Sequence, residues 1–149
     1  MNRRHDVVID DHLLLRILLD DEPTGLRRAV GAVFTTGLWY HRLCRALAST
    51  AVTGPLSRRL GAADPTFGAT ALRSVTDLPE TIGVLSFRTL AWPMARLVSA
   101  QVRLNLLSLE ALAAAEELGA ELCLATQDEN PTLLGAAAAR GLPIRLIAD

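Results

Sequence analysis

Three acidic residues of this chain stand where a parallel sheet would bring them together. Asp10 directly follows an apolar run, and Asp128 comes three residues after another. Glu110 lies near the start of an alanine-rich helical stretch, 107–115. Since the carboxyl ends of parallel strands meet at one edge of a sheet, we expect the three carboxylates to be neighbours. Carboxylate oxygens are the ligands that Mg²⁺ prefers, so the pattern predicts a site for a hard divalent cation.

Each of these acids also has a purely structural interpretation. Asp10 lies between an expected strand and an expected helix, where aspartate is a favoured N-cap. Glu110, two residues after Ser108, would answer the helix dipole from the first turn, a contribution of roughly 0.3–1 kcal/mol. Asp128 shortly precedes an Asn-Pro pair that is typical of a helix start, so it would be an ordinary turn residue. The conjunction of all three acids at or beside strand ends favours the functional interpretation.

The elements that must position these acids alternate between strand and helix. Strands are expected at 6–10, 30–34, 82–85, 121–125 and 144–147, and helices at 11–20, from 35–36 to 54, 56–60, 67–75, 94–103, from 108 and from 131. Buried strands separated by helices imply a parallel sheet covered on both faces. Because the chain has no internal repeat, low-complexity tract or linker, we expect residues 1–149 to form a single α/β domain with four to five strands.

Composition restricts the class of protein further. None of the apolar runs approaches the roughly 18 residues needed to cross a bilayer, and the N-terminus lacks the apolar region of a signal peptide, so we expect a cytoplasmic protein with no membrane partner. Lysine is absent, which excludes a lysine Schiff base or a phosphate-loop lysine. The net charge of −1 gives no overall attraction to nucleic acid, so such binding would depend on local arginine clusters.

The N-terminal segment closely resembles the first strand of a response-regulator receiver domain. Residues 7–11 reproduce the apolar strand and the acidic pair of that family. A receiver domain also needs a phospho-accepting aspartate after a later strand and a lysine at the far end of the sheet. The nearest acid, Asp64, lies in a Gly/Pro turn, and no lysine exists. This resemblance therefore fails at the residues that would do the chemistry.

The last third of the chain resembles the PIN domain, the nuclease fold of bacterial VapC-type toxins. In that family a late helix carries an Asp-Ala-hydrophobic-x-Ala-Ala pattern, and the next strand ends in Thr-x-Asp. Residues 110–115 and 126–128 match both patterns at the expected spacing, except that Glu110 replaces the family's aspartate and is one methylene longer. Ile9-Asp10 matches the first strand of the family, and residues 136–147 match its usual ending. The resemblance implies a PIN-like, three-layer α/β/α fold.

This resemblance implies a toxin-type ribonuclease that depends on Mg²⁺ or Mn²⁺. Asp10, Glu110 and Asp128 would hold the cation, which would activate a water molecule for attack on phosphorus. Thr126 would hydrogen-bond a ligand or a metal-bound water. The family's second acid is replaced by Arg42, or by His41 if the register is one residue off. In an active enzyme Arg42 would contact the scissile phosphate as a bidentate donor. An RNA substrate and an antitoxin or other protein partner are implied with this activity.

Arg42 also supports a different hypothesis, in which the chain is a non-catalytic PIN-like module that binds RNA or a protein. Two unit charges at about 4 Å interact by about 4 kcal/mol at an effective dielectric near 20, so a guanidinium in place of a carboxylate would strongly weaken cation binding. Under this hypothesis Arg42 neutralises the acids. Trp39 and Tyr40 beside it could stack bases, although adjacent helical aromatics are more often core and interface residues.

A third hypothesis is a structural α/β protein whose homodimer surface is its function. Leucines are so frequent in residues 13–19 that they exceed the needs of one buried helix stripe. Surplus apolar surface of this kind favours a homodimer face on the first helix.

Overall fold

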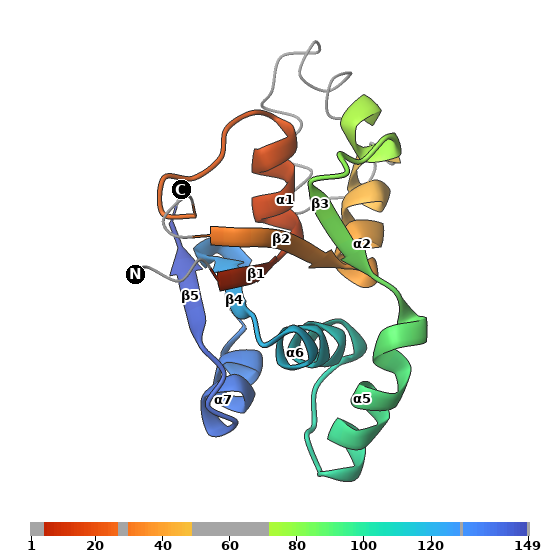
Figure 1. Cartoon of the computed structure of the whole chain (residues 1–149), viewed down its shortest axis with the longest axis vertical. Coiled ribbons are helices and arrows are strands. Elements are labelled where there is room, and N and C mark those ends of the chain that lie inside the picture. The colour runs from red at the N-terminus through yellow and green to blue at the C-terminus, as the bar shows by residue number, and fades with distance from the viewer. Residues whose placement is uncertain (1–4, 27–29, 49–71, 129, 149) are drawn as a thin grey trace.

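The chain folds around a single five-stranded, all-parallel sheet with helices on both faces (Figure 1). The structure is a computed structural model that describes residues 5–26, 30–48, 72–128 and 130–148, except for the side chains of Val30 and Asp128. The strand order across the sheet is β3-β2-β1-β4-β5. The elements are β1 (His5–Ile9), α1 (Asp11–Leu18), β2 (Val30–Thr36), α2 (Gly37–Ala48), β3 (Ile82–Leu85), α5 (Phe87–Ser99), α6 (Leu106–Leu118), β4 (Glu121–Ala125), the 3₁₀ turn η1 (Thr126–Asp128), α7 (Pro131–Ala139) and β5 (Ile144–Ile147).

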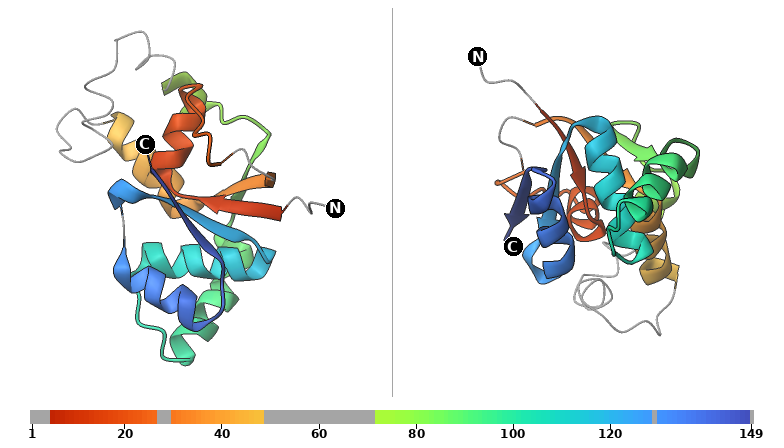
Figure 2. Two further views of the ribbon diagram at one scale, coloured as in Figure 1. Left: turned by 90° about the vertical axis from the view of Figure 1, so that its left-hand side faces the viewer. Right: turned by 90° about the horizontal axis from the view of Figure 1, so that it is seen from below.

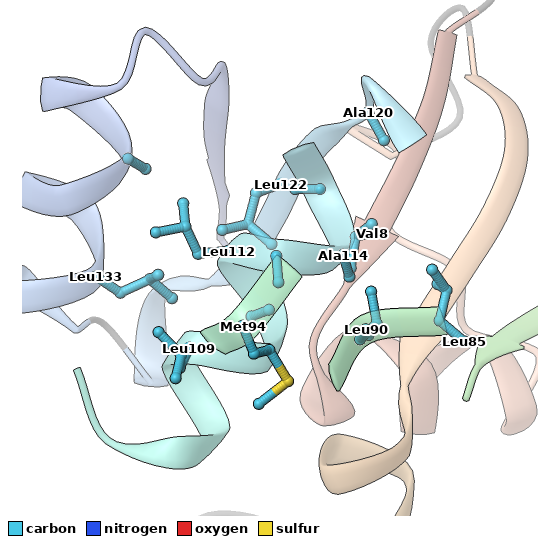
Figure 3. Packing of buried hydrophobic residues seen from close by; sticks show 14 of the residues in the cluster. Val8, Leu85, Leu90, Met94, Leu109, Leu112, Ala114, Ala120, Leu122 and Leu133 are labelled. Atoms are coloured by element: carbon cyan, nitrogen blue, oxygen red, sulfur yellow. The ribbon is translucent and has the colours of Figure 1, made fainter. Parts of the chain in front are cut away.

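Successive side chains of β1 point to opposite faces of the sheet and pack into two separate hydrophobic cores. Val7 and Ile9 face α1 and α2 and pack with the leucines of those helices. Val8, between them, points to the other face and packs against α6 and α5 (Figure 3). Figure 2 shows α6 and α7 side by side on that second face. Strands that are apolar on both sides are typical of a parallel sheet between two helical layers, so the expected three-layer α/β/α architecture is confirmed.

The first helix does not offer the dimer surface that the sequence suggested. Leu13, Leu14 and Leu15 are at most 1 % exposed, and Leu18 is also buried, all within the core shared by α1, α2 and the sheet. A helix that lies between a sheet and a neighbouring helix buries more than one stripe, which explains the surplus leucines. The argument for a homodimer through this helix is therefore wrong.

Helices α5 and α6 have boundaries that differ from the expected ones. Helix α5 begins at Phe87 rather than 94 and contains Pro93, and it ends at Ser99 because Gln101 adopts a left-handed conformation with φ 66°. Helix α6 begins at Leu106 with Asn105 as its N-cap. The expected helix at 56–60, most of the one at 67–75 and Asp64 lie outside the described residues.

None of the helices in the described parts of the chain has the length and apolar character needed to cross a membrane.

Candidate functional site

Asp10 ends β1, and backbone groups use both of its carboxylate oxygens. Its Oδ1 accepts a hydrogen bond from the Leu13 N–H at 2.9 Å, which makes Asp10 the N-cap of α1. Its Oδ2 accepts from the Ala125 N–H at 2.8 Å, at the end of β4. The residue is only 1 % exposed. Asp10 therefore joins a helix start to the neighbouring strand, and the N-cap interpretation is confirmed.

Arg42 forms its ion pair with Asp11, a residue to which sequence reasoning gave no such role. Both Nε and Nη2 of Arg42 donate to this carboxylate, with 2.6 Å between Nη2 and Oδ1. The side chain of Asp11 is fully buried, whereas 35 % of the Arg42 side chain is exposed. The bidentate pair links α1 to α2 and neutralises a carboxylate that would be costly to bury alone.

Glu110 reaches from α6 to the start of α2. Its Oε1 accepts a hydrogen bond from the Leu38 N–H at 2.8 Å, and a Cβ at Gly37 would lie 3.8 Å from its Oε2. The carboxylate thus satisfies one of the first N–H groups of α2 and complements the positive end of that helix. The expected role in the first turn of its own helix is wrong, because α6 begins at Leu106 and places Glu110 beyond that turn.

The second carboxylate oxygen of Glu110, Oε2, differs from Oε1. Glu110 is fully buried, and its Oε2 has no hydrogen-bond partner in the described parts of the chain. Buried polar atoms are nearly always hydrogen-bonded, so an orphaned one calls for an explanation such as a bound ion or water. The Oε2 atom of Glu110 is the observation that best fits a cation at this edge of the sheet.

The remaining predicted residues follow β4. Thr126 is exposed at the start of η1, directly after Ala125, which bonds to Asp10. Asp128 ends η1, and its side chain lies outside the described residues. The structure therefore brings the chain segment of the third predicted ligand to the same edge as Asp10 and leaves the ligand role of Asp128 a prediction.

A pocket of about 270 Å³ opens at this edge of the sheet. Trp39 and Arg42 line it from α2, while Asn105 and Asn130 line it from the N-caps of α6 and α7. Ser108 connects the two caps, because its Oγ accepts a hydrogen bond from Asn130 Nδ2 at 2.8 Å. None of the described lining residues is acidic. Arginine and two helix N-termini together favour an anion over a cation.

The acids that are described do not assemble a three-ligand metal site. Across residues 5–26, 30–48, 72–128 and 130–148, no group of three Asp, Glu, His or Cys side chains is placed to hold an ion. Asp10 is engaged by two backbone N–H groups, and Asp11 is held by Arg42. Only Glu110 Oε2 fits a cation, so the described donor set is incomplete without Asp128.

The aromatic residues of α2 are not an open stacking surface. Trp39 is 3 % exposed and belongs to the core below the sheet. Tyr40 donates a hydrogen bond to the Val75 carbonyl, and burial raises the pKa of its phenol. The base-stacking role considered for Trp39 is therefore wrong and its core interpretation is confirmed, whereas Tyr40 is only partly buried and its stacking role stays a prediction.

Cys123 lies inside the sheet below the site. Burial, reinforced by the nearby Glu121 carboxylate, raises the pKa of its thiol to about 11. Cys123 and Cys44 are both free thiols, and Cys44 is only half-buried. A thiol with so high a pKa is neutral at physiological pH and acts as a small apolar residue.

The site has to be interpreted from its own geometry. The sequence matches no protein-family model, and no curated protein is significantly similar to it. The geometry shows a pocket with Arg42 in its wall, next to Asp10 and Asp11, whose oxygens already bond to backbone N–H groups and to the guanidinium.

Proposed function

We propose that this protein is a non-catalytic, PIN-like RNA-binding module that takes up an RNA phosphate in the pocket beside Arg42. The observation that carries the proposal is the position of Arg42, an arginine in the wall of the pocket at the carboxyl edge of the sheet. Ligands of open α/β folds bind at this edge. Guanidinium groups suit phosphate because their donors lie in one plane, and the Nε and Nη2 donors of Arg42 also bond to Asp11.

The surroundings of Arg42 support an anionic ligand. The pair with Asp11 links α1 to α2 and holds the guanidinium at the pocket wall, so little side-chain freedom would be lost on binding. Helices α6 and α7 both begin at the pocket, and each helix start carries about half a positive charge. The start of α2 differs, because Glu110 already complements it. Among the described lining residues, the starts of α6 and α7 therefore remain positive, whereas the charge of Arg42 is already paired with Asp11.

The described acids support binding without a metal ion. Asp10 holds α1 and β4 together, and Asp11 fixes Arg42, so both carboxylates have structural tasks. RNA binding in this proposal consequently needs no Mg²⁺. Affinity should fall with rising salt, because each neutralised phosphate releases counterions.

The proposal is tested with a fluorescent 12-nucleotide oligouridine in EDTA. The double variant Asp11→Asn/Arg42→Gln removes the guanidinium without leaving a buried charge, and we expect it to bind at least 10-fold more weakly than the natural chain. Arg73→Gln, at an exposed arginine outside the site, is the matched control and should bind normally. Equal affinity of the double variant and the natural chain would refute the proposal.

A second candidate is the metal-dependent ribonuclease, and Glu110 Oε2 is the observation that favours it. In that case Asp10, Glu110 and Asp128 would share a Mg²⁺ or Mn²⁺ ion, with Thr126 beside it. Incubation of single-stranded RNA with Mn²⁺ should then give cleavage products, and Glu110→Gln and Asp128→Ala should abolish them. Absence of cleavage by the natural chain, or cleavage unchanged in both variants, would eliminate this candidate.

A further inference from the structure

Helix α5 carries an exposed line of alternating cationic and aromatic side chains. Arg88, Trp92 and Arg96 follow one another at intervals of four residues, and all three are exposed. Trp92 is 74 % exposed, the highest value among the exposed large hydrophobic residues of the described chain. A helix rises 1.5 Å per residue, so the two arginines are about 12 Å apart along the axis, with the indole midway.

None of the described elements packs against this line of exposed side chains on α5. Helix α5 is anchored by its other side, where Leu90, Met94 and Leu97 are buried in the core cluster that includes α6. Figure 3 shows Leu90 and Met94 in this cluster. Within the described parts of the chain neither Arg88 nor Arg96 makes an ion pair, and the helix itself contains no acidic residue. In Figure 1 this green helix lies on the outside of the molecule, beyond α6.

We infer that this line of α5 is a second contact for single-stranded RNA, with a base stacked on Trp92 and phosphates bound by Arg88 and Arg96. The inference rests on the proposed function, since it takes RNA as the ligand. Stacking on an exposed aromatic residue tolerates every base, and flanking arginines neutralise the backbone, which is how proteins bind single strands without sequence readout. The roughly 12 Å between the arginines leaves room for one stacked base between two phosphates.

A second copy of the chain fits this surface less well. Two-fold pairing of α5 with itself would bring arginines of both helices together without an acid on either helix to offset them. Phe87 and Val98 are also exposed on an adjoining side of α5, so an acidic protein helix is the competing occupant. Arg88 and Arg96 could bind either RNA or an acidic protein helix. Only RNA has a base that would stack on the Trp92 indole.

The test uses intrinsic fluorescence, because only one of the two tryptophans is exposed. Trp39 is 3 % exposed and Trp92 is 74 % exposed, so quenching by a 12-nucleotide oligouridine in EDTA should come from Trp92. Because Trp92→Ala lacks this reporter, its affinity is measured with the fluorescent oligouridine, and we expect it to be roughly 10-fold weaker by loss of stacking. The double variant Arg88→Gln/Arg96→Gln should reduce the slope of log affinity against log salt by about 1.4, since two phosphates are lost. Arg73→Gln is again the control.

The possible results separate this inference from the proposed function. If Asp11→Asn/Arg42→Gln loses RNA while both α5 variants bind normally, the α5 inference fails and the pocket proposal stands. If only the α5 variants lose RNA, the inference holds and the pocket proposal fails. If oligoglutamate quenches Trp92 and oligouridine does not, α5 is a surface for an acidic protein and the inference is overturned.

Discussion

Two helices of this protein each carry a tryptophan close to an arginine, and the structure uses the two pairs in opposite ways. In α2, Trp39 is buried and Arg42, one turn later, is held by the buried Asp11. In α5, Trp92 is exposed and Arg96, one turn later, makes no ion pair within the described residues. In α2 the tryptophan therefore lies in the core and the arginine lines the pocket. In α5 the same two residue types, at nearly the same spacing, are both exposed.

The difference lies in the neighbours of each helix. Helix α2 contacts α1, α6 and two strands of the sheet, so both the indole and the guanidinium find partners. Helix α5 packs mainly on α6 and faces outward beyond it (Figure 1). A side chain that is left exposed at a cost to solubility is more informative about binding than one that packing explains.

The largest expected contrast is between the two tryptophans. Trp39→Ala should lower the free energy of unfolding by about 3–5 kcal/mol, because it leaves a large cavity in the core. Trp92→Ala should change it by less than about 0.5 kcal/mol, as is usual for surface substitutions. Urea unfolding of both variants measures the contrast. Equal losses of unfolding free energy in the two variants would show that Trp92 is buried and would contradict its exposed position on α5.

Replacing Arg42 should likewise lower the free energy of unfolding far more than replacing Arg96. Arg42→Gln leaves the Asp11 carboxylate buried without its partner, which costs about 3–5 kcal/mol for a fully buried pair. Since Arg42 is partly exposed, we expect the lower end of this range. The double variant Asp11→Asn/Arg42→Gln should recover most of the loss, and Arg96→Gln should cost less than about 0.5 kcal/mol. A double-mutant cycle that shows no coupling would contradict the ion pair.

Replacement of Asp10 shows whether this acid at the carboxyl edge of the sheet stabilises the fold. Asp10→Ala should lower the free energy of unfolding by about 2–3 kcal/mol, because it removes the cap of α1, worth about 1 kcal/mol, and leaves the buried Ala125 N–H unsatisfied. Thermal and urea unfolding without metal give the value. A variant as stable as the natural chain would mean that Asp10 serves function alone.

The smallest effect is expected at alkaline pH, from the buried Cys123. Its folded-state pKa of about 11 exceeds the ordinary value of 9.0, so the neutral thiol favours the folded state below pH 9, and this contribution is lost as pH rises towards 11. By pH 10 the loss should be about 1.4 kcal/mol. In Cys123→Ala that part of the pH dependence should vanish, whereas Trp92→Ala should retain it. An unchanged pH profile in Cys123→Ala would contradict the raised pKa.

The sequence predicted what depends on nearby residues. The strand at 121–125, the Asp10 cap and the Asn130-Pro131 helix start are local patterns, and all three are confirmed. The Arg42–Asp11 pair and the Glu110–Leu38 hydrogen bond join residues 31 and 72 positions apart. Local sequence patterns cannot predict contacts between residues so far apart in the chain. These contacts depend on how α2 packs between α1 and α6.

Helix α5 was misjudged for a related reason. The helix was expected at 94–103, whereas the observed helix begins at Phe87 and includes Pro93, which removes a hydrogen bond from its interior. The buried side formed by Leu90, Met94 and Leu97 stabilises the helix through packing. Because the helix was expected to begin only at 94, Trp92 and its flanking arginines were not seen as one line.

The most direct test of the central claim, that Arg42 contacts an RNA phosphate in the pocket, is a nitrogen NMR titration with 12-nucleotide oligouridine in EDTA. The account predicts that the Arg42 Nε–H and the Asn130 side-chain amide shift with the same apparent affinity, and that the Trp92 indole N–H shifts with them. Arg42 and Asn130 signals that stay unchanged at saturating RNA, or that move only after Mg²⁺ is added, would contradict it.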